Sequence, residues 1–112
     1  VVVFTSDNGG ATWFGGSNEP LRSGKTTPFQ GGVRVPTFVL DLTEDKRYFG
    51  QGGRQWDGLA HMSDWLPTLL RLGGGASAAL PAGLDGHDIS PALRQGATSP
   101  RGSVLLEMYY AS

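Results

Sequence analysis

The sequence predicts a C-terminal segment of a larger α/β domain, and three observations support this class. Two apolar, strand-like runs at 1–4 and 33–40 precede a clear amphipathic helix pattern at 64–72. A short helical segment at 90–96 and a third strand-like run at 103–111 follow. Three strands are too few for a self-sufficient sheet, and both ends of the sequence fall inside strand-like runs. We therefore expect a piece of a longer chain whose central sheet is incomplete.

The first strand candidate is "VVVF", residues 1–4, whose β-branched and aromatic residues show no alternation. That pattern is typical of a strand buried on both faces of a parallel sheet. A glycine-rich stretch at 9–24 then predicts a long irregular loop. In the second candidate, "VRVPTFVL", Pro36 lacks a backbone donor and limits the run to an edge, a bulge or a short strand. Residues 41–60 are polar and predict a surface excursion.

The longer helix is predicted over "DWLPTLLRL", with Asp64 as its N-cap. Pro67 then falls in the first turn, where its missing N–H has no intrahelical partner. Arg71 near the end and Gly73 after it match the usual C-terminal signals. The helix should pack on a core through its apolar side chains, Trp65, Leu66, Leu69, Leu70 and Leu72.

The shorter helix is predicted over "SPALRQG". Ser90 is the expected N-cap, Pro91 occupies the first helical position, and Gly96 ends the helix. The run "SVLLEMYYA" then predicts the last strand, and no internal repeat is present.

The composition argues against several classes of function. The sequence has no cysteine, so it holds no disulfide, thiolate metal site or thiol nucleophile. Nine Lys and Arg balance ten Asp and Glu without a basic stripe, which argues against nucleic acid or a membrane surface as a partner. The apolar runs are far shorter than the roughly 20 residues that span a bilayer. No Asn-x-Ser/Thr sequon for N-glycosylation is present.

The stretch "TSDNGG" places Asp7 and Asn8 directly after the first strand. In open α/β sheets ligands bind beyond the carboxyl ends of strands, and carboxylate and carboxamide oxygens both suit Ca²⁺ or Mg²⁺. Asp-Asn-Gly-Gly is also a good turn, and taken alone the turn is the favoured interpretation. Two donors are too few for Ca²⁺, which takes about 6–8 oxygens. If this is a metal site, most of it lies elsewhere.

Lys25 lies in the loop "SGKTT", where its ammonium can meet an anionic oxygen of phosphate or sulfate. A loop lysine taken alone is more typical of solvated surface. The P-loop spacing fails, because position 19 holds Glu instead of the required Gly. Arg22 and Arg34 are further candidates for anion contact, with a structural role favoured for Arg34. Helix-entry and loop roles are predicted for the two histidines, His61 and His87, because neither has metal-ligand spacing.

Several segments together resemble the sulfatases of the alkaline-phosphatase-like superfamily, most closely the arylsulfatase B (N-acetylgalactosamine-4-sulfatase) type. They occur in the family's order and cover nearly the whole chain apart from 41–60: "FTSDNGG", "GGSNEPLRSGKTTPFQGGVRVPTFV", "HMSDWLPTLLRLGG", "LDGHDISPAL" and "SPR" before the last strand. Each is weak alone, and the combination is highly specific. The resemblance implies the C-terminal part of an alkaline-phosphatase-like mixed-sheet α/β sandwich. Residues 1–102 would belong to its catalytic domain, and 103–112 to a strand leading into a C-terminal subdomain.

The resemblance also implies roles for individual residues. In sulfatases the Asp-Asn pair after this strand ligates the active-site Ca²⁺, which fits Asp7 and Asn8. The lysine of the "GK" element contacts the substrate sulfate, which fits Lys25. The implied reaction is hydrolysis of a sulfate ester, such as a sulfated glycosaminoglycan, by a formylglycine made in a C/S-x-P-x-R motif. These residues lack that motif, so the nucleophile is expected upstream and the isolated chain is expected to be inactive.

Three positions depart from the family's usual pattern, which puts loop shape and selectivity in doubt. The family usually has Gly after the lysine, an acidic residue before "GGVR" and often an aromatic before the Pro, where this chain has Thr26, Gln30 and Glu19. Two alternatives stay open. A related phosphatase or phosphonate monoester hydrolase is one, because a metal and a lysine do not distinguish sulfur from phosphorus. A non-catalytic sulfatase-like fragment is the other. A lysosomal or secreted location follows from the resemblance alone, and no oligomeric state is implied.

Overall fold

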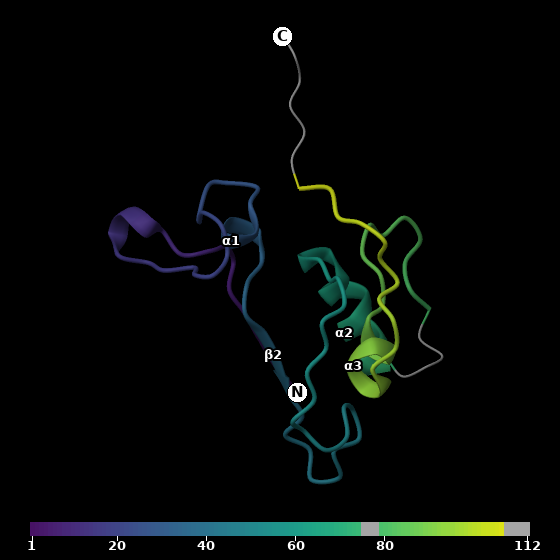
Figure 1. Ribbon diagram of the computed structural model, residues 1–112. Coiled ribbons are helices and arrows are strands. Elements are labelled where there is room, and N and C mark those ends of the chain that lie inside the picture. Colours follow the sequence, from purple (N-terminus) through teal and green to yellow (C-terminus); the bar gives the residue numbers. More distant parts are fainter. Residues whose placement is uncertain (75–78, 107–112) are drawn as a thin grey trace. The chain divides into compact units, whose positions relative to one another are not determined.

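The structure, a computed structural model, describes residues 1–74 and 79–106 and divides into two compact units (Figure 1). The strand unit comprises Val2–Leu40 with the described residues after Val104, and the helix unit comprises Val1 and Asp41–Val104. In chain order the elements are β1 (Val2–Thr5), the 3₁₀ turn η1 (Thr12–Phe14), α1 (Gln30–Val33), β2 (Thr37–Leu40), the 3₁₀ turn η2 (Met62–Asp64), α2 (Trp65–Gly74) and α3 (Ser90–Gln95). The mixture of helices and strands agrees with the predicted α/β class, and the alkaline-phosphatase-like sandwich stays a prediction.

The strand unit contains a two-stranded sheet in which β1 and β2 run antiparallel. Phe4 pairs with Phe38, and their rings stack with centroids 4.9 Å apart. On the other face, Thr37 Oγ1 donates to Thr5 Oγ1 at 2.9 Å. The expectation of a parallel strand buried on both faces is wrong for the described residues, since the pair is antiparallel and Phe4 is 50% exposed. An apolar run indicates that a strand can be buried, but it does not specify the direction of the neighbouring strand.

The second strand is shorter than its predicted range of 33–40. Pro36 cannot donate a ladder hydrogen bond, and β2 begins at Thr37, directly after it. Val33 belongs to the helical turn α1 instead of the predicted strand. Gly31 and Gly32 permit this turn, because a Cβ on Gly31 would overlap the carbonyl of Ser23. The close approach of two backbone segments therefore decides the conformation here, in place of strand propensity.

The longer helix α2 begins at Trp65, as predicted, but the 3₁₀ turn η2 precedes it and Asp64 is not the N-cap. Asp64 is the third residue of a capping box whose cap is His61, because the Asp64 carboxylate reaches back to His61 N at 2.8 Å. His61 Nδ1 in turn accepts from Ser63 N at 3.3 Å, so the predicted helix-entry role of this histidine is confirmed. Gly73 lies inside α2 and does not end it. A glycine ends a helix when it adopts a left-handed conformation, and Gly73 is not among the positive-φ glycines of the described residues.

The core of the helix unit lies where α2 meets α3. Ile89, just before α3, is 1% exposed, and its N–H donates to the buried Thr68 Oγ1 at 3.0 Å. The side of α2 that is buried is therefore the one bearing Pro67 and Thr68. Much of the predicted apolar packing face is not covered by the described residues: Leu66, Leu69 and Leu70 are 41% to 55% exposed. The amphipathic pattern identified the helix, but not the side that this chain itself covers.

The shorter helix agrees with its prediction at both ends except for the cap. Pro91 lies in the first turn, and Gly96 ends α3 with a φ of 70°. Ser90 is not the N-cap, because it already belongs to the helix and its N–H donates to Asp88 Oδ1 at 2.8 Å. The longer Asp88 side chain reaches this amide from two residues earlier.

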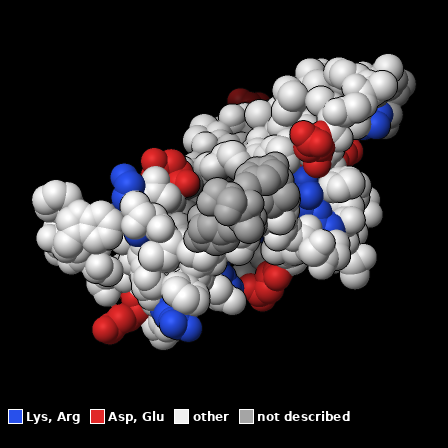
Figure 2. All heavy atoms as spheres, turned by 90° about the horizontal axis from the view of Figure 1, so that it is seen from above, with Lys and Arg blue, Asp and Glu red and all other residues white. Residues whose placement is uncertain are grey.

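The remaining sequence predictions concern the end of the chain and its surface. Residues 103–106 form no strand, and 107–111 lie outside the described residues, so the proposed domain boundary after residue 102 stays a prediction. Among the described residues, no helix has the length and apolar character needed to cross a membrane. Figure 2 shows acidic and basic side chains interspersed on the visible face, which agrees with the balanced charge of the sequence.

Candidate functional site

The two predicted calcium ligands, Asp7 and Asn8, lie in the bend that follows β1 in the strand unit. The side chain of Asp7 is exposed and that of Asn8 is partly exposed. Neither side chain forms a hydrogen bond or ion pair with another described residue. The Asn8 carbonyl accepts from Ser6 Oγ at 2.9 Å, which holds the bend through the backbone. The side-chain oxygens of both residues are therefore available to a ligand.

Lys25 lies in the same unit, in a loop that is attached to the segment after β1. Lys25 N donates to Gly10 O at 3.2 Å, and Gly9 N donates to Gly32 O at 2.8 Å. The Lys25 side chain is exposed and makes no ion pair within residues 1–74 and 79–106. The structure thus joins the lysine loop to the bend through backbone hydrogen bonds. No hydrogen bond or ion pair within those residues joins its ammonium to the two candidate calcium ligands.

The oxygen donors of this bend fit part of a calcium site. Asp7 offers a carboxylate and Asn8 a carboxamide oxygen, both of the hard type that Ca²⁺ prefers. Ca²⁺ takes about 6–8 oxygen ligands. Over the described part of the chain, no group of three or more His, Cys, Asp or Glu side chains is placed to hold a metal ion. The donor set is chemically suitable and incomplete.

The other two cations of the 20–36 loop have partners. The Arg22 guanidinium lies over the Phe29 ring, 3.8 Å from its centroid. Arg34 Nη1 donates to Gln30 Oε1 at 3.4 Å, in line with the structural role predicted for it. Of the three cationic side chains in this loop, Lys25 is the one that no described residue engages.

Asn18 is a polar residue of the strand unit that was not singled out from the sequence. Its Oδ1 accepts from Gly10 N at 2.7 Å, and its Nδ2 donates to Gly10 O at 2.9 Å. An Asn beside Gly, Ser and Pro predicts a local turn. Nothing in that pattern indicates a partner eight residues away, so only the folded loop reveals this contact.

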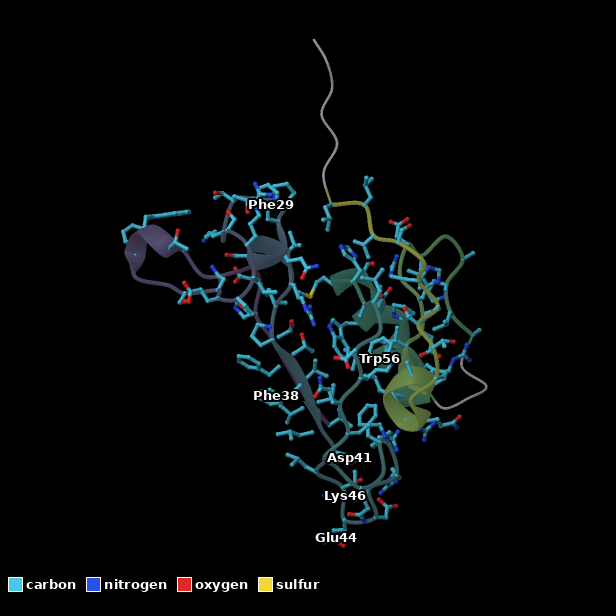
Figure 3. All side chains as sticks on the ribbon, in the orientation of Figure 1. Phe29, Phe38, Asp41, Glu44, Lys46 and Trp56 are labelled. Carbon is cyan, nitrogen blue, oxygen red and sulfur yellow. The ribbon has the colours of Figure 1, made fainter. Side chains whose placement is uncertain are left out.

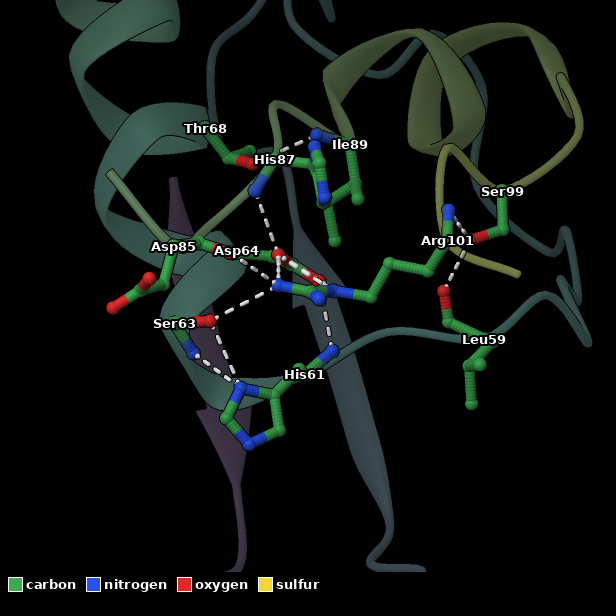
Figure 4. A network of polar contacts seen from close by, with 10 residues as sticks. All are labelled: Leu59, His61, Ser63, Asp64, Thr68, Asp85, His87, Ile89, Ser99 and Arg101. Carbon is green, nitrogen blue, oxygen red and sulfur yellow. Dashed lines mark hydrogen bonds and ion pairs between the residues drawn. The ribbon is translucent and has the colours of Figure 1, made fainter. Parts of the chain in front are cut away.

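A second group of polar side chains lies in the helix unit around Asp64 and Arg101 (Figure 4). Arg101 Nε lies 2.9 Å and 2.7 Å from the two Asp64 carboxylate oxygens. Arg101 Nη2 also donates to Ser63 Oγ at 3.1 Å and to the Asp85 carbonyl at 2.9 Å. His87 N donates to Asp64 Oδ1 at 2.8 Å, so the loop role predicted for His87 is confirmed. Because the Asp64 charge is paired with Arg101 and the Arg101 donors have partners, this cluster holds segments of the helix unit together.

The ionisation of Asp64 follows from these contacts. Burial raises the pKa of the Asp64 carboxyl, but hydrogen bonds from Arg101 and from the His87 and His61 amides outweigh burial. The net effect lowers the pKa below its ordinary value of 3.8. Asp64 is therefore ionised at neutral pH and serves as a fixed negative charge.

Asp41 organises the polar excursion at 41–60 in the same way, next to Lys46 (Figure 3). Its carboxylate accepts from Tyr48 N at 2.8 Å and Phe49 N at 3.0 Å, and Lys46 Nζ donates to its carbonyl at 2.9 Å. Desolvation raises the pKa of Asp41, but hydrogen bonds from Thr43, Phe49 and Tyr48 hold it well below its usual range. This loop is thus held by one carboxylate without forming a helix or strand.

Comparison with known proteins identifies the family. No protein-family model matches the chain. Mouse arylsulfatase J is 39% identical over 106 residues, which are 94% of this chain and 17% of the relative. Human arylsulfatase A is 37% identical over 123 aligned residues, covering 98% of this chain and 21% of the relative. Pig N-acetylgalactosamine-6-sulfatase is 36% identical over 104 residues, covering 89% and 19%.

The chain spans only 17% to 21% of the length of these three relatives. In each case the match extends over most of the chain itself, including both the strand unit and the helix unit. This confirms the resemblance to the sulfatases that the ordered motifs indicated, while the arylsulfatase B type stays a prediction. The chain belongs to the sulfatase family.

Proposed function

We propose that this chain forms part of a sulfuric ester hydrolase and contributes Asp7, Asn8 and Lys25 to its active site. Family membership supports the reaction class, since the relatives named above are sulfatases. The hydrogen bond from Lys25 N to Gly10 O supports the site, because it fixes the lysine loop beside the bend that bears two available oxygen donors. A sulfated glycosaminoglycan is the proposed substrate class.

Each residue has a distinct task in this proposal. The Lys25 ammonium donates to a sulfate oxygen and offsets its negative charge. The side-chain oxygens of Asp7 and Asn8 provide two of the ligands of a Ca²⁺ ion. When bound, Ca²⁺ would supply positive charge that stabilises the sulfate oxygens in the transition state. The nucleophile is a formylglycine from a C/S-x-P-x-R motif outside these 112 residues, because the sequence here contains no such motif.

The test starts with the coding sequence upstream, which is expected to contain the C/S-x-P-x-R motif. The encoded protein is then assayed with an aryl sulfate and with the matching aryl phosphate. We expect turnover of the sulfate, and Lys25→Ala should lower kcat/KM by about 10²- to 10³-fold, the usual cost of removing a donor to a developing charge. Lys46→Ala is the matched control and should leave kcat/KM unchanged, because Lys46 Nζ bonds the Asp41 carbonyl in the helix unit.

The same assay decides between the alternatives. Turnover of the phosphate without the sulfate would replace the sulfatase by a phosphatase or phosphonate hydrolase. Binding of Ca²⁺ or inorganic sulfate without turnover of either ester would favour a non-catalytic relative.

Two further parts of the proposal have their own tests. The isolated 112-residue chain should not hydrolyse an aryl sulfate, because it lacks the nucleophile motif; turnover by this chain would contradict the assignment. A lysosomal or secreted location is proposed from the family alone. Fractionation of cells that produce the protein checks it, with recovery in lysosomes or in the medium as the expected result.

A further inference from the structure

The carboxamide of Asn18 lies where two segments of the strand unit cross. Its Oδ1 accepts from Gly10 N at 2.7 Å, while its Nδ2 donates to Gly10 O at 2.9 Å and to Ser23 O at 3.2 Å. A carboxamide has one acceptor oxygen and two N–H donors, and all three are used here. The side chain therefore pairs with both backbone polar groups of Gly10, as a neighbouring strand would, and it also bonds the lysine loop at Ser23.

The residues that Asn18 joins are close in sequence to the candidate site. Gly10 is two residues after Asn8, and Ser23 is two residues before Lys25. The same Gly10 carbonyl accepts from Lys25 N at 3.2 Å. Asn18 thus fixes the backbone at one point on each of the two segments that bear the proposed site residues.

The segments pack closely at the crossing. Gly24 is buried, and a Cβ there would lie 2.7 Å from Asn18 Nδ2 and would overlap the Gly10 carbonyl. Thr27 Oγ1 donates to the Gly24 carbonyl at 2.8 Å from within the lysine loop. The lysine loop is pressed against Asn18 and Gly10 at the residue directly before Lys25.

Other hydrogen bonds hold the strand unit when Asn18 is changed. Gly9 N still donates to Gly32 O at 2.8 Å, and Gly31 N still donates to Arg22 O at 2.8 Å. The bond from Lys25 N to Gly10 O, at 3.2 Å, would then be the direct hydrogen bond left between Gly10 and the lysine loop, without the three carboxamide bonds beside it. Loss of the Asn18 carboxamide should therefore loosen the lysine loop relative to the bend without unfolding the unit.

We propose that Asn18 is a positioning residue that sets the Lys25 loop against the Asp7–Asn8 bend, and so aims the Lys25 ammonium at the anion held there. This inference rests on the proposed function, because it assumes that Lys25 contacts a sulfate oxygen. The inference adds to the proposed site a residue, Asn18, that does not itself contact the anion. Its effect should pass through Lys25.

The main test substitution is Asn18→Asp in the full protein that carries the activity. Asp keeps the acceptor for Gly10 N but places an oxygen opposite the Gly10 and Ser23 carbonyls, where Nδ2 donated. Asn18→Ala removes all three bonds without adding a charge, and it serves if the Asp variant does not fold. Thr37→Val is the matched control, because it removes one side-chain hydrogen bond, to Thr5 Oγ1, in the same unit and away from the loop.

We expect both Asn18 variants to lower kcat/KM for an aryl sulfate by about 10- to 100-fold, the usual cost of misplacing a catalytic group by about 1 Å. The dissociation constant of inorganic sulfate, measured by titration calorimetry at saturating Ca²⁺, should rise about 10-fold, on the same argument from misplacement. Each variant, like Thr37→Val, should still unfold in one cooperative thermal transition, because the backbone hydrogen bonds of the unit remain. Kinetic constants and sulfate affinity equal to those of the unsubstituted protein would overturn the proposal.

A double-mutant cycle separates positioning from a general structural role. If Asn18 acts through Lys25, Asn18→Ala combined with Lys25→Ala loses no more activity than Lys25→Ala alone. Additive losses would show that Asn18 acts elsewhere and would refute the proposal. The single Lys25→Ala variant distinguishes the two levels of inference. If it retains full activity and sulfate affinity, the proposed function fails; if only the Asn18 variants are neutral, the positioning role fails alone.

Discussion

Two nitrogens of the Arg101 guanidinium contact the fully buried Asp64 carboxylate, with Nε 2.7 Å from Oδ2 and Nη2 2.5 Å from Oδ1. The pair connects the residue before α2 to a segment 37 positions later. The same carboxylate closes the capping box with His61 and accepts from His87 N. A single side chain thus ties three segments of the helix unit, and removal of either partner leaves a buried charge without compensation.

Asp64→Ala should therefore destabilise the helix unit strongly. Loss of one partner of a buried ion pair costs about 3–5 kcal/mol, and two backbone amides lose their acceptor as well. Urea unfolding followed by tryptophan fluorescence measures the change, since Trp56 and Trp65 lie in this unit. Asp45→Ala is the control, because its pair with Arg47 is exposed and its loss should leave the midpoint unchanged. Equal midpoints for both variants would show that the Asp64–Arg101 pair does not stabilise the unit.

The stability of the helix unit should fall in acid with a definite sign. The folded-state pKa of Asp64 is lowered from 3.8, so its ionised form stabilises the fold above that pH. This contribution is lost as the pH falls from 3.8 through the lowered value, and the lowered pKa of Asp41 acts in the same direction. The difference in unfolding free energy between the unsubstituted chain and Asp64→Asn should be constant from neutral pH to about pH 5 and shrink below it. A constant difference down to the acid transition would contradict this assignment.

Thr26→Gly should stabilise the strand unit. Thr26 has a φ of 72°, a left-handed conformation that is strained for a β-branched residue. Relief of this strain, which costs about 1–2 kcal/mol, should exceed the added chain entropy and leave a net gain of about 1 kcal/mol. Thr98→Gly is the control at a residue without positive φ and should destabilise the chain. Thermal unfolding compares the two, and destabilisation by both would rule out strain at Thr26.

The exposed leucines of α2 should make the isolated chain prone to self-association and to binding of hydrophobic dyes. Leu66 and Leu70 lie one helical turn apart, at 55% and 41% exposure. The double substitution Leu66→Gln and Leu70→Gln should reduce binding of a hydrophobic dye and light scattering, with little change in helix content by circular dichroism. Leu42→Gln, at a single exposed leucine outside α2, should change neither signal. Loss of helix content in the double variant would instead show that these leucines are needed for folding.

The local signals of the sequence predicted the elements where short-range chemistry decides. Gly96 ended α3 because its left-handed conformation is available without a Cβ penalty, and Pro36 set the start of β2 because it cannot donate a ladder bond. Asp64 shows the limit of such signals. Its side chain was correctly expected to cap a helix start, but it acts from inside the turn, and its main partner, Arg101, is 37 residues away.

For the candidate site, the sequence supplies the chemical groups: the carboxylate of Asp7, the carboxamide of Asn8 and the ammonium of Lys25. The order of its motifs also indicated the sulfatase family. How the segments that bear these groups meet depends on the folded loop. Lys25 N reaches Gly10 O because Gly24 lets the lysine loop approach closely, and Asn18 fills the crossing with three hydrogen bonds. No local pattern specifies such a contact, because it depends on which distant backbone groups the folded loop leaves unpaired.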